Sequence, residues 1–597
     1  MKRYDLYAHR KYPIIIIIII CIFLIIVKLF IIQIIDKSYK LSAENNTIRK
    51  IIQYPERGWI YDRNNTLLVS NQRGHDIMIS PYQVESQIDT SFFCEIFQIS
   101  KSDFLRRIKQ AKQYSYYKPS IFIKNIEKNK FADIQEYLYR FKGFFSQPRY
   151  IREYNTNSGG NIFGYTSLIS YEELLNNKAY DRNDMIGVTG IEKVFETKLK
   201  GEKGVQRKIV DVFGKYQGDF QNGKYDTLPK KGQDIKITID IILQEYAEKL
   251  MSNKRGSIVA IEPESGEILC LLSSPSYSPK MFIGKNRSKN FRDLFIHPGK
   301  PLYDRSTSAL YPPGSIFKLL NALIGLQEKK INPEQLIKCN LGWNYKSRLN
   351  IGCHEHKSPL NLNQAIAQSC NAYFCETFIK IIQDSPSKNL DKWKNYIESF
   401  GLNQTFQNDL YNEKKGFIPN AKYYDNLYGK KRWGAPTCVS LAIGQDAILM
   451  TPIQMANLTA TIANKGFYRI PHIVKQDSLV EKMKCLIDSN YFEPVIYGMV
   501  NAIEDQYGTA KLGVINDLEI GGKTGTAQNP HGSDHSVFIA FAPISKPKIA
   551  IAVFVENGGW GSEMAVPIGS LCIEKYLLKN IQRKKLEDRM IKTKINY

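Results

Sequence analysis

The sequence has 597 residues, enough for two or three domains with a large buried core. Its 82 Lys and Arg outnumber its 58 Asp and Glu and give a formal charge of +24, which is common in proteins that bind nucleic acid or an anionic surface. Because the sequence contains no RNA- or DNA-binding motif, we expect no nucleic-acid partner. Lys, Ile, Asn and Tyr are all frequent, as AT-rich coding would produce, and the charge also fits a position against anionic lipid.

The N-terminal region contains an apolar segment, residues 14–35, interrupted only by Lys28 and Gln33. As a helix it would be about 33 Å long, enough to cross the hydrocarbon core of a membrane. It is longer than the apolar part of a signal peptide and lacks a small-residue cleavage site. We therefore expect a single-pass anchor in the cytoplasmic (inner) membrane. Basic residues precede the segment, which predicts residues 1–13 in the cytoplasm and the rest of the chain outside.

The next region, residues 40–230, combines short strand-like runs with polar, glycine-containing turns and shows no catalytic cluster. We expect it to form a separate mixed α/β domain, called the pedestal below. A linker follows at about residue 231, then a strand over residues 234–240 and an amphipathic helix over residues 241–251.

The C-terminal domain is expected over residues 235–580. Strands are predicted between residues 256 and 272 and again between 518 and 556, with helices dominating from about 315 to 465. Two groups of strands separated by a helical block predict an α/β (α+β) domain in which one sheet packs against helices. After a last helix at 565–579, we expect residues 581–597 to be a basic, mobile tail.

Ser315 and Lys318 form the first of three motifs that carry chemistry. Two prolines precede Ser315, so a helix should begin at about this residue. The three-residue spacing then places the serine hydroxyl and the lysine amine on one helix face. A lysine whose pKa is lowered by burial or by a neighbouring cation can remove the serine proton and create a nucleophile. Alone, this motif is common by chance.

Two further motifs occur in order along the chain. Ser369-Cys370-Asn371 is expected in a short loop between helices, and Lys523-Thr524-Gly525-Thr526 on a strand. Taken singly, these could be a capping serine, a turn asparagine and a surface lysine. Together with Ser315 and Lys318 they match the S-x-x-K, S-D/C-N and K-T-G pattern of serine penicilloyl enzymes.

Each position of the later motifs has an expected role. Ser369 relays a proton between Lys318 and the leaving amine, and Asn371 holds the substrate amide and orients Lys318. Lys523 attracts the substrate carboxylate and lowers the pKa of Lys318. Thr524 and Thr526 hydrogen-bond that carboxylate, Gly525 lets a peptide lie against the strand, and the backbone N–H groups of Ser315 and Thr526 form an oxyanion hole.

With these motifs, the chain resembles class B penicillin-binding proteins over nearly its whole length. The other signatures of that family are present as Arg57-Gly58, Asp62-Arg63-Asn64, Gly190-Ile191-Glu192, Asp304-Arg305, Gly444-Gln445, Thr451-Pro452 and Gly508-Thr509-Ala510. One departure is Asp446, where the family usually has glycine; this difference concerns the local turn and not the catalytic residues.

The resemblance implies a penicilloyl serine transferase fold and D,D-transpeptidase activity. Ser315 would attack the penultimate D-Ala of a peptidoglycan stem peptide, and an amine of a neighbouring stem would resolve the acyl-enzyme. It also implies a lipid-linked precursor as substrate source, β-lactams as covalent inhibitors and a glycan polymerase of the SEDS type as partner. No cofactor is expected for the chemistry.

Within the family, the elongation enzyme, penicillin-binding protein 2, carries a metal-binding insert between the first two motifs. The counterpart here is Cys339, Cys353, His356 and Cys370, three thiolates and one imidazole suited to tetrahedral zinc. His356 is preferred to His354 by its spacing from Cys353. The alternatives are a Cys339–Cys353 disulfide or buried free thiols.

Three other kinds of function share part of this pattern. A septal class B transpeptidase differs mainly in the Cys/His insert. A β-lactamase or carboxypeptidase would hydrolyse the acyl-enzyme, but the only E-x-x-L-N sequence, Glu172 to Asn176, precedes Ser315 and is read as a chance match. A non-catalytic scaffold that activates a glycan polymerase would not need all the motif residues intact.

Overall fold

A computed structural model describes residues 11–35, 48–85, 87–211, 216–284, 286–346, 349–407 and 409–595. The first helix, α1 (Lys11–Phe30), continues as a π-helical segment, η2 (Ile31–Ile35). Within the described residues, one helical stretch, Tyr12–Ile34, is long and apolar enough to cross a membrane, as predicted. Most of the predicted cytoplasmic segment, residues 1–10, lies outside the described residues.

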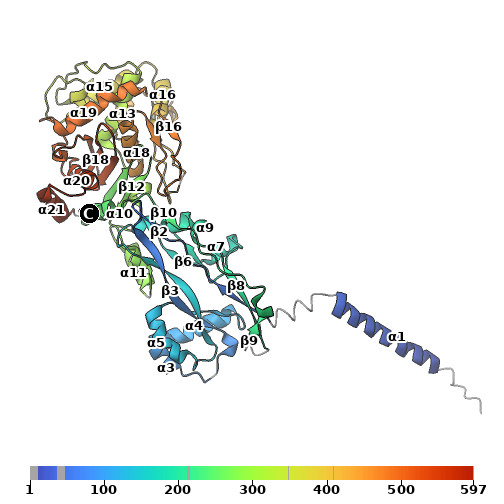
Figure 1. Ribbon diagram of the computed structural model, residues 1–597. Helices are drawn as coiled ribbons and strands as arrows, with labels where there is room; N and C mark the ends of the chain where they lie inside the picture. Colours follow the sequence, from blue (N-terminus) through green and yellow to red (C-terminus); the bar gives the residue numbers. More distant parts are fainter. Residues whose placement is uncertain are drawn as a thin grey trace, which may run out of the picture.

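The pedestal contains two main sheets that lie between α1 and the C-terminal domain along the chain (Figure 1). In the larger one, β10, β2, β3 and β4 are neighbours in that order and β5 also pairs with β3; the smaller has the order β1-β8-β9. The strands are β1 (Ile48–Gln53), β2 (Ile60–Tyr61), β3 (Leu67–Ile79), β4 (Ser120–Glu127), β5 (Phe144–Tyr154), β8 (Gly204–Val210), β9 (Tyr216–Asp219) and β10 (Ile235–Lys236).

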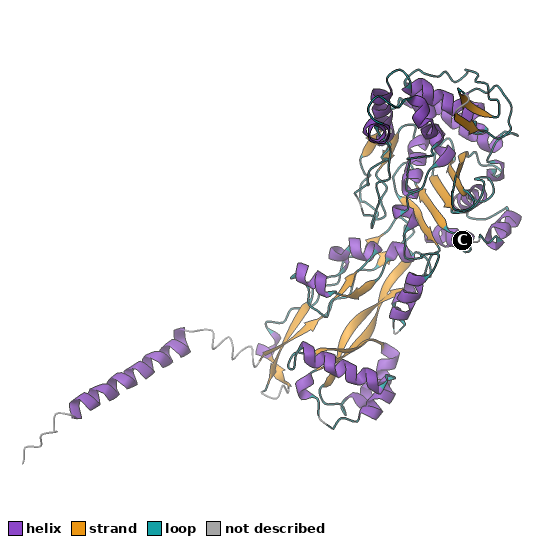
Figure 2. Ribbon diagram, turned by 180° about the vertical axis from the view of Figure 1, so that it is seen from behind, coloured by secondary structure: helices purple, strands orange, loops and turns teal. Residues whose placement is uncertain are grey.

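Helices pack at one end of the larger pedestal sheet and short elements follow β5 (Figures 1 and 2). Phenylalanines dominate the contact between these helices and the sheet: Phe93, Phe104, Phe122 and Phe144 are all buried and in ring contact. The helices there are α3 (Thr90–Phe97), α4 (Lys101–Tyr114) and α5 (Lys128–Leu138). The short elements are α6 (Gly160–Phe163), β6 (Thr166–Leu168), α7 (Tyr171–Asn176), β7 (Met185–Gly187), α8 (Gly190–Val194) and α9 (Glu196–Leu199).

Two pedestal signatures that are far apart in sequence meet in a buried ion network. Arg57 lies 2.7 Å from Glu192, and Arg152 on β5 lies 2.6 Å from the other oxygen of the same carboxylate. Although burial raises the pKa of Glu192, the charges of Arg152 and Arg57 outweigh it and lower that pKa below its usual value. A Cβ on Gly58 would lie 1.8 Å from the Gln233 carbonyl oxygen, which explains the glycine beside Arg57.

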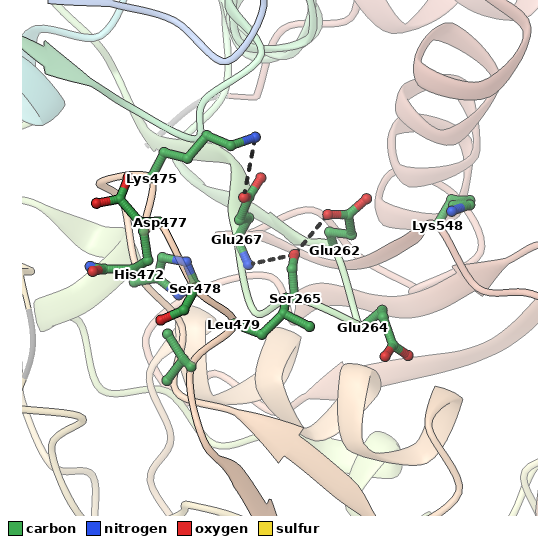
Figure 3. A pocket seen from close by; sticks show the side chains of 12 residues that line it. Glu262, Glu264, Ser265, Glu267, His472, Lys475, Asp477, Ser478, Leu479 and Lys548 are labelled. Atoms are coloured by element: carbon green, nitrogen blue, oxygen red, sulfur yellow. Dashed lines mark hydrogen bonds and ion pairs between the residues drawn. The ribbon is translucent and has the colours of Figure 1, made fainter.

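The C-terminal domain meets the pedestal through a strand pair and a charged contact. Strand β10 pairs in parallel with β2, and Arg63 lies 3.5 Å from Glu267. Glu267 also forms an ion pair with Lys475 at 3.7 Å, and the Ser265 hydroxyl donates a hydrogen bond to Glu262 (2.7 Å) in the pocket beside them (Figure 3). This pocket contains none of the predicted catalytic residues.

The sheet of the C-terminal domain has the order β12-β11-β19-β18-β17 and is antiparallel throughout. Its strands come from two distant parts of the sequence, as predicted. Helices α10 and α20 cover one face and α18 the other, giving a sandwich of helix, sheet and helix (Figure 2). The bounds are α10 (Ile241–Met251), β11 (Gly256–Ile261), β12 (Ile268–Ser274), α18 (Pro452–Ala463), β17 (Gly521–Ala527), β18 (His535–Ala542), β19 (Ile549–Val555) and α20 (Ala565–Leu578).

Most of the predicted helical block lies at the end of the C-terminal domain that is far from the pedestal (Figure 1), and it holds the first two motifs. The sequence did not predict its small hairpin, β13 (Gly342–Tyr345) and β14 (Leu349–Gly352), because four-residue strands give too short a pattern. The other elements are α11 (Arg287–Ile296), α12 (Arg305–Ser308), α13 (Lys318–Gln327), α14 (Leu362–Ala367), α15 (Asn371–Ile382), α16 (Pro386–Glu398), α17 (Ala421–Tyr428), β15 (Phe467–Arg469), β16 (Lys482–Lys484) and α19 (Phe492–Glu504).

Two expectations need correction. The strand predicted over residues 234–240 is reduced to β10 because the following residues pair only by a single bridge, from Ile237 to Val474. The expected mobile tail instead contains a helix, α21 (Lys584–Lys592). Its Met590 side chain is fully buried, and the buried Lys254 ammonium donates a hydrogen bond to the Met590 carbonyl oxygen. Burial of Met590, together with contacts such as the Arg583–Glu574 ion pair at 2.7 Å, therefore holds a segment that is basic in composition.

Candidate active site

Ser315 lies in a tight turn that packs against the edge strand β17. The turn is a 3-10 helix, η6 (Gly314–Phe317), which runs directly into α13, so the predicted helix start is confirmed. Gly314 has φ +60°, and a Cβ there would lie 2.6 Å from the Thr526 carbonyl oxygen on β17. Only glycine allows both this backbone conformation and this close approach. Ser315 is partly exposed beside the strand.

Lys318 is fully buried at the first turn of α13 and reaches the second motif. Its ammonium nitrogen lies 2.7 Å from the Ser369 carbonyl oxygen, 3.2 Å from the Ser369 hydroxyl and 2.5 Å from the Asn371 side-chain oxygen. Burial lowers the pKa of Lys318 to about 8. A lysine with such a pKa is partly unprotonated near neutral pH and can accept a proton.

The second motif occupies the loop between α14 and α15, as predicted. Ser369 has φ +53°, a left-handed conformation that is unfavourable for serine and turns its side chain toward Lys318. Asn371 is fixed at both ends, because its side-chain nitrogen donates to the Gly352 carbonyl oxygen at 2.7 Å and its oxygen faces Lys318. The hairpin β13–β14 thus supports the catalytic loop.

The third motif lies on β17, which has a strand partner on one side only. Lys523 is fully buried, and burial, followed by the charge of Lys318, lowers its pKa well below the usual value. Its neighbour Thr524 contacts the Thr509 hydroxyl at 2.7 Å. Gly525 leaves room for the Ser315 turn, since a Cβ there would lie 3.1 Å from the Pro313 carbonyl oxygen. Thr526 accepts a hydrogen bond from the Gly561 backbone at 3.4 Å.

The predicted metal ligands come together beside the second motif. One ligand atom from each of Cys339, Cys353, His356 and Cys370 lies within 4.8 Å of all the others. In a tetrahedral zinc site, thiolate sulfurs about 2.3 Å from the metal lie about 3.8 Å apart, so the spacing fits the ion. His356 Nδ1 lies 2.6 Å from the Lys357 carbonyl oxygen, which leaves Nε2 facing Cys353 at 3.3 Å.

The metal-ligand group also favours His356 over His354, which is not a member of the cluster. A hydrogen bond from the Cys370 thiol, opposed by burial, lowers the pKa of Cys353 well below its usual value. A lowered thiol pKa favours the thiolate, the form that binds soft metals. Among the described residues, no carboxylate belongs to this cluster.

Two supporting residues were present in the sequence signatures but were not assigned a role. Thr509 anchors the active-site loop, because its backbone N–H donates to the Ala367 carbonyl oxygen at 3.1 Å while its hydroxyl contacts Thr524. Gln445 donates a hydrogen bond to the Thr526 carbonyl oxygen at 3.2 Å. Asp446, next to it, adopts φ +67°, which aspartate tolerates better than most residues, so the turn forms without the usual glycine.

The E-x-x-L-N sequence is remote from this site in structure. It forms α7 in the pedestal, where Glu173 takes part in a capping box with Ser170 and pairs with Lys193 at 2.9 Å. These are the contacts of a surface helix, so the interpretation as a chance match agrees with its position.

Comparisons with known proteins give a family match for each of the two domains. Residues 256–573 match the family model of the penicillin-binding protein transpeptidase domain, and residues 52–237 match that of the penicillin-binding protein dimerisation domain. The chain is 30% identical to peptidoglycan D,D-transpeptidase MrdA of Acinetobacter baumannii, over 94% of this chain and 87% of that protein. It is 28% identical to MrdA of Escherichia coli K12, over 88% and 87% respectively.

Solved structures give the same result. A complex between penicillin-binding protein 2 and MreC from Helicobacter pylori superposes with a TM-score of 0.77 at 25% identity, covering 89% of this chain and 99% of the matched one. Penicillin-binding protein 2 of Pseudomonas aeruginosa, bound to WCK 5153, superposes with a TM-score of 0.66 at 27% identity, covering 89% and 97%.

Proposed function

The chain belongs to the class B penicillin-binding proteins, in the branch of peptidoglycan D,D-transpeptidase MrdA (penicillin-binding protein 2), and we propose that it cross-links stem peptides through an acyl-enzyme on Ser315. Such an enzyme acts in lateral wall synthesis during cell elongation. The observation that carries the residue assignment is the position of buried Lys318, which contacts Ser369 and Asn371 from the same helical segment that presents Ser315.

Acylation begins with Lys318 taking the Ser315 proton. The hydroxyl oxygen then attacks the carbonyl carbon of the penultimate D-Ala, and backbone N–H groups of Ser315 and Thr526 stabilise the oxyanion. The proton passes through Ser369 to the leaving D-Ala amine. Because Ser369 lies 3.2 Å from Lys318, the relay needs no rearrangement of the loop.

Substrate binding helps to set the protonation states of the two lysines. Two neighbouring buried ammonium groups disfavour each other, so the pair holds a second proton weakly. A substrate carboxylate bound near Lys523, with hydrogen bonds from Thr524 and Thr526, favours the proton on Lys523. Lys318 then remains neutral, which is the form needed for the base.

The free edge of β17 can hold the donor peptide in an extended conformation beside Ser315. After D-Ala leaves, an amine from a second stem peptide attacks the ester and restores Ser315. β-Lactams acylate the same serine because they present a carbonyl and a carboxylate in similar positions.

Covalent labelling by fluorescent penicillin tests this assignment. The full-length protein should be labelled, and Ser315→Ala should abolish the label while leaving the melting temperature nearly unchanged. The partly exposed Ser276, which lies outside the site, provides a matched serine-to-alanine control that should still be labelled. Labelling of Ser315→Ala at the wild-type rate would contradict the proposal.

Cys339, Cys353, His356 and Cys370 are proposed to hold one structural zinc ion. The donor set of three thiolates and one imidazole supports this, and the ion would fix the loop that carries Ser369 and Asn371. Metal analysis of the purified full-length protein should find about one zinc per chain, and His356→Ala should reduce it more than His354→Ala. Equal zinc content in the two variants would contradict the ligand assignment.

The topology and the partners are also proposed. The basic residues before α1 support a cytoplasmic N-terminus and an extracytoplasmic catalytic domain. A SEDS-type polymerase would supply glycan strands made from lipid-linked precursor, and a protein like MreC would contact this chain as in the Helicobacter pylori complex. Protease added outside should cleave the C-terminal domain in spheroplasts but not in inverted (inside-out) membrane vesicles, which enclose the extracytoplasmic face. The reverse pattern would overturn this orientation.

A further inference from the structure

Three of the ten cysteines lie close enough together for redox chemistry. The sulfurs of Cys339, Cys353 and Cys370 are within 4.8 Å of one another, whereas a disulfide requires about 2.05 Å. Cys353 is partly exposed and belongs to a loop that follows β14, while Cys370 is buried at the N-terminus of α15. A short movement of the Cys353 loop toward the fixed helix would close the distance.

We propose that Cys353 and Cys370 are a redox modification site, joined in a disulfide by a peroxide oxidant, and that this bond switches off acylation of Ser315. The catalytic consequence rests on the function proposed above. The bond itself does not, because it depends only on the two sulfurs and their surroundings.

The chemistry is a two-electron oxidation of one thiolate and one thiol. The partly exposed Cys353 thiolate attacks hydrogen peroxide, breaks its O–O bond, and becomes a sulfenic acid with release of hydroxide. The Cys370 sulfur then attacks the Cys353 sulfur and forms the S–S bond, and the Cys370 proton leaves with the sulfenic oxygen as water. Overall, the two sulfurs lose two electrons and one peroxide gains them. A disulfide sulfur lacks the negative charge that binds zinc, so the cluster loses metal affinity.

The pairing of Cys353 with Cys370 is favoured by a contact already present. The Asn371 backbone N–H donates to the Cys353 sulfur at 3.3 Å, which holds Cys353 against the first turn of α15. The Cys339 sulfur also interacts with both of these sulfurs, but Cys339 precedes the hairpin, where its backbone N–H donates to the Ser358 hydroxyl at 2.8 Å. A Cys339–Cys353 bond would join the segments on either side of the hairpin without bonding to the catalytic loop.

Formation of the bond must disturb the second motif. Cys370 stands between Ser369 and Asn371, which both contact the Lys318 ammonium. When the Cys353 sulfur moves onto Cys370, the Asn371 N–H loses its acceptor, and the loop carrying Gly352 shifts under the Asn371 side chain. Ser369 is already in a left-handed conformation, so the loop has little freedom to absorb the movement.

The C-terminal domain is proposed to lie outside the cytoplasmic membrane, and this location favours disulfide formation. Thiols in an extracytoplasmic compartment lack the reducing environment of the cytosol, so a disulfide formed there persists. Zinc coordination would keep the sulfurs reduced as long as no peroxide is present. The cluster would then link wall synthesis to oxidative conditions at the cell surface.

The test uses the full-length, reduced, zinc-loaded protein in detergent, treated with increasing hydrogen peroxide. Three quantities are measured in parallel: the Cys353–Cys370 peptide by mass spectrometry, zinc released to a chromogenic chelator, and the rate of fluorescent penicillin labelling. All three should change together, with labelling falling by about tenfold or more. Dithiothreitol and zinc should restore it, which methionine oxidation would not allow.

Variants separate the cluster from other cysteines. Cys375→Ser, one turn further along α15, should remain as sensitive to peroxide as the wild type. Cys370→Ser should form no such bond, and its labelling rate, high or low, should not fall reversibly with peroxide. If Cys370→Ser does not fold, the reversible loss in the wild-type protein still tests the proposal.

Three results would overturn it: a Cys339–Cys353 peptide as the main product, a Cys353–Cys370 peptide with unchanged labelling, or reversible inactivation without either peptide. Failure of the proposed function would look different. The reduced protein would then show no labelling before any peroxide is added, while Ser315→Ala would still form the Cys353–Cys370 bond.

Discussion

The pedestal and the active site both bury charged side chains, but they treat the charges in opposite ways. In the pedestal, the Glu192 carboxylate is paired with Arg57 and Arg152, and all three charges are retained. In the active site, Lys318 and Lys523 are fully buried, and no carboxylate among the described residues pairs with either. A paired charge stabilises the domain interior, whereas an unpaired buried lysine gives up its proton readily and is suited to catalysis.

The strongest test of this contrast is Lys318→Met, which removes the unpaired charge and keeps an apolar side chain of similar length. Loss of the general base should lower the acylation rate by about 100- to 10,000-fold. The melting temperature should stay equal or rise, because a costly buried ammonium is removed. Stopped-flow labelling and calorimetry measure the two effects, and a large loss of stability would show that Lys318 is mainly structural.

The opposite pattern is expected for Glu192→Gln in the pedestal. The change leaves Arg152 without a carboxylate partner and Arg57 with Glu196 alone, and it should reduce the free energy of unfolding by about 3–5 kcal/mol. The acylation rate of the folded fraction should remain within about twofold of wild type, since additivity holds between distant sites. Glu173→Gln, at an exposed pair on α7, is the matched control and should change stability little.

Sequence and structure can be compared at these same two places. The active-site residues were predictable because each motif is short, ordered and tied to a chemical role, so Ser315, Lys318 and Lys523 needed no knowledge of distances. The pedestal network was present only as separate signatures, since nothing local in Arg57 or Glu192 indicates that they meet. Likewise, Thr509 was visible as a signature, but its contact with Thr524 depends on how α19 and β17 pack.

The departures from prediction have a similar cause. The strands of the hairpin β13–β14 are too short for a periodic pattern, and the basic composition around helix α21 masks its amphipathic pattern; long-range contacts hold both in place. Asn371 fixes the end of the hairpin through Gly352, and Met590 anchors α21 in the core. Local propensity is weak in such segments, so tertiary contacts decide their structure.

The acylation rate should depend on pH through Lys318. Burial lowers its pKa to about 8, so below that pH the base is protonated and the rate should fall about tenfold per unit. A lysine pKa that is lower in the folded state also makes the protein more stable as pH rises from about 8 toward the usual lysine value, because only the unfolded chain then binds the proton.

The pedestal should respond in the opposite pH range. The lowered pKa of Glu192 adds stability above its unfolded value, and this is lost only as pH falls through the lower folded pKa. Acylation rates measured from about pH 5 to 10, with melting curves extended down to about pH 2, would separate the two regions. An acylation rate that is constant between pH 6 and 9 would contradict the role of Lys318 as the titrating base.

The smallest effect is expected at Thr509, which supports the active site without meeting the substrate. Thr509→Val keeps the shape but removes the hydroxyl that contacts Thr524 at 2.7 Å. Loss of one such hydrogen bond is worth about 1 kcal/mol, or about a fivefold fall in the second-order rate of penicillin labelling. Because Thr524 would bind the substrate carboxylate, the change should appear in substrate binding rather than in the acylation step. Thr509→Ser, which retains the hydroxyl, should recover most of the rate; an equal loss in both variants would mean that the methyl packing, not the hydrogen bond, positions Thr524.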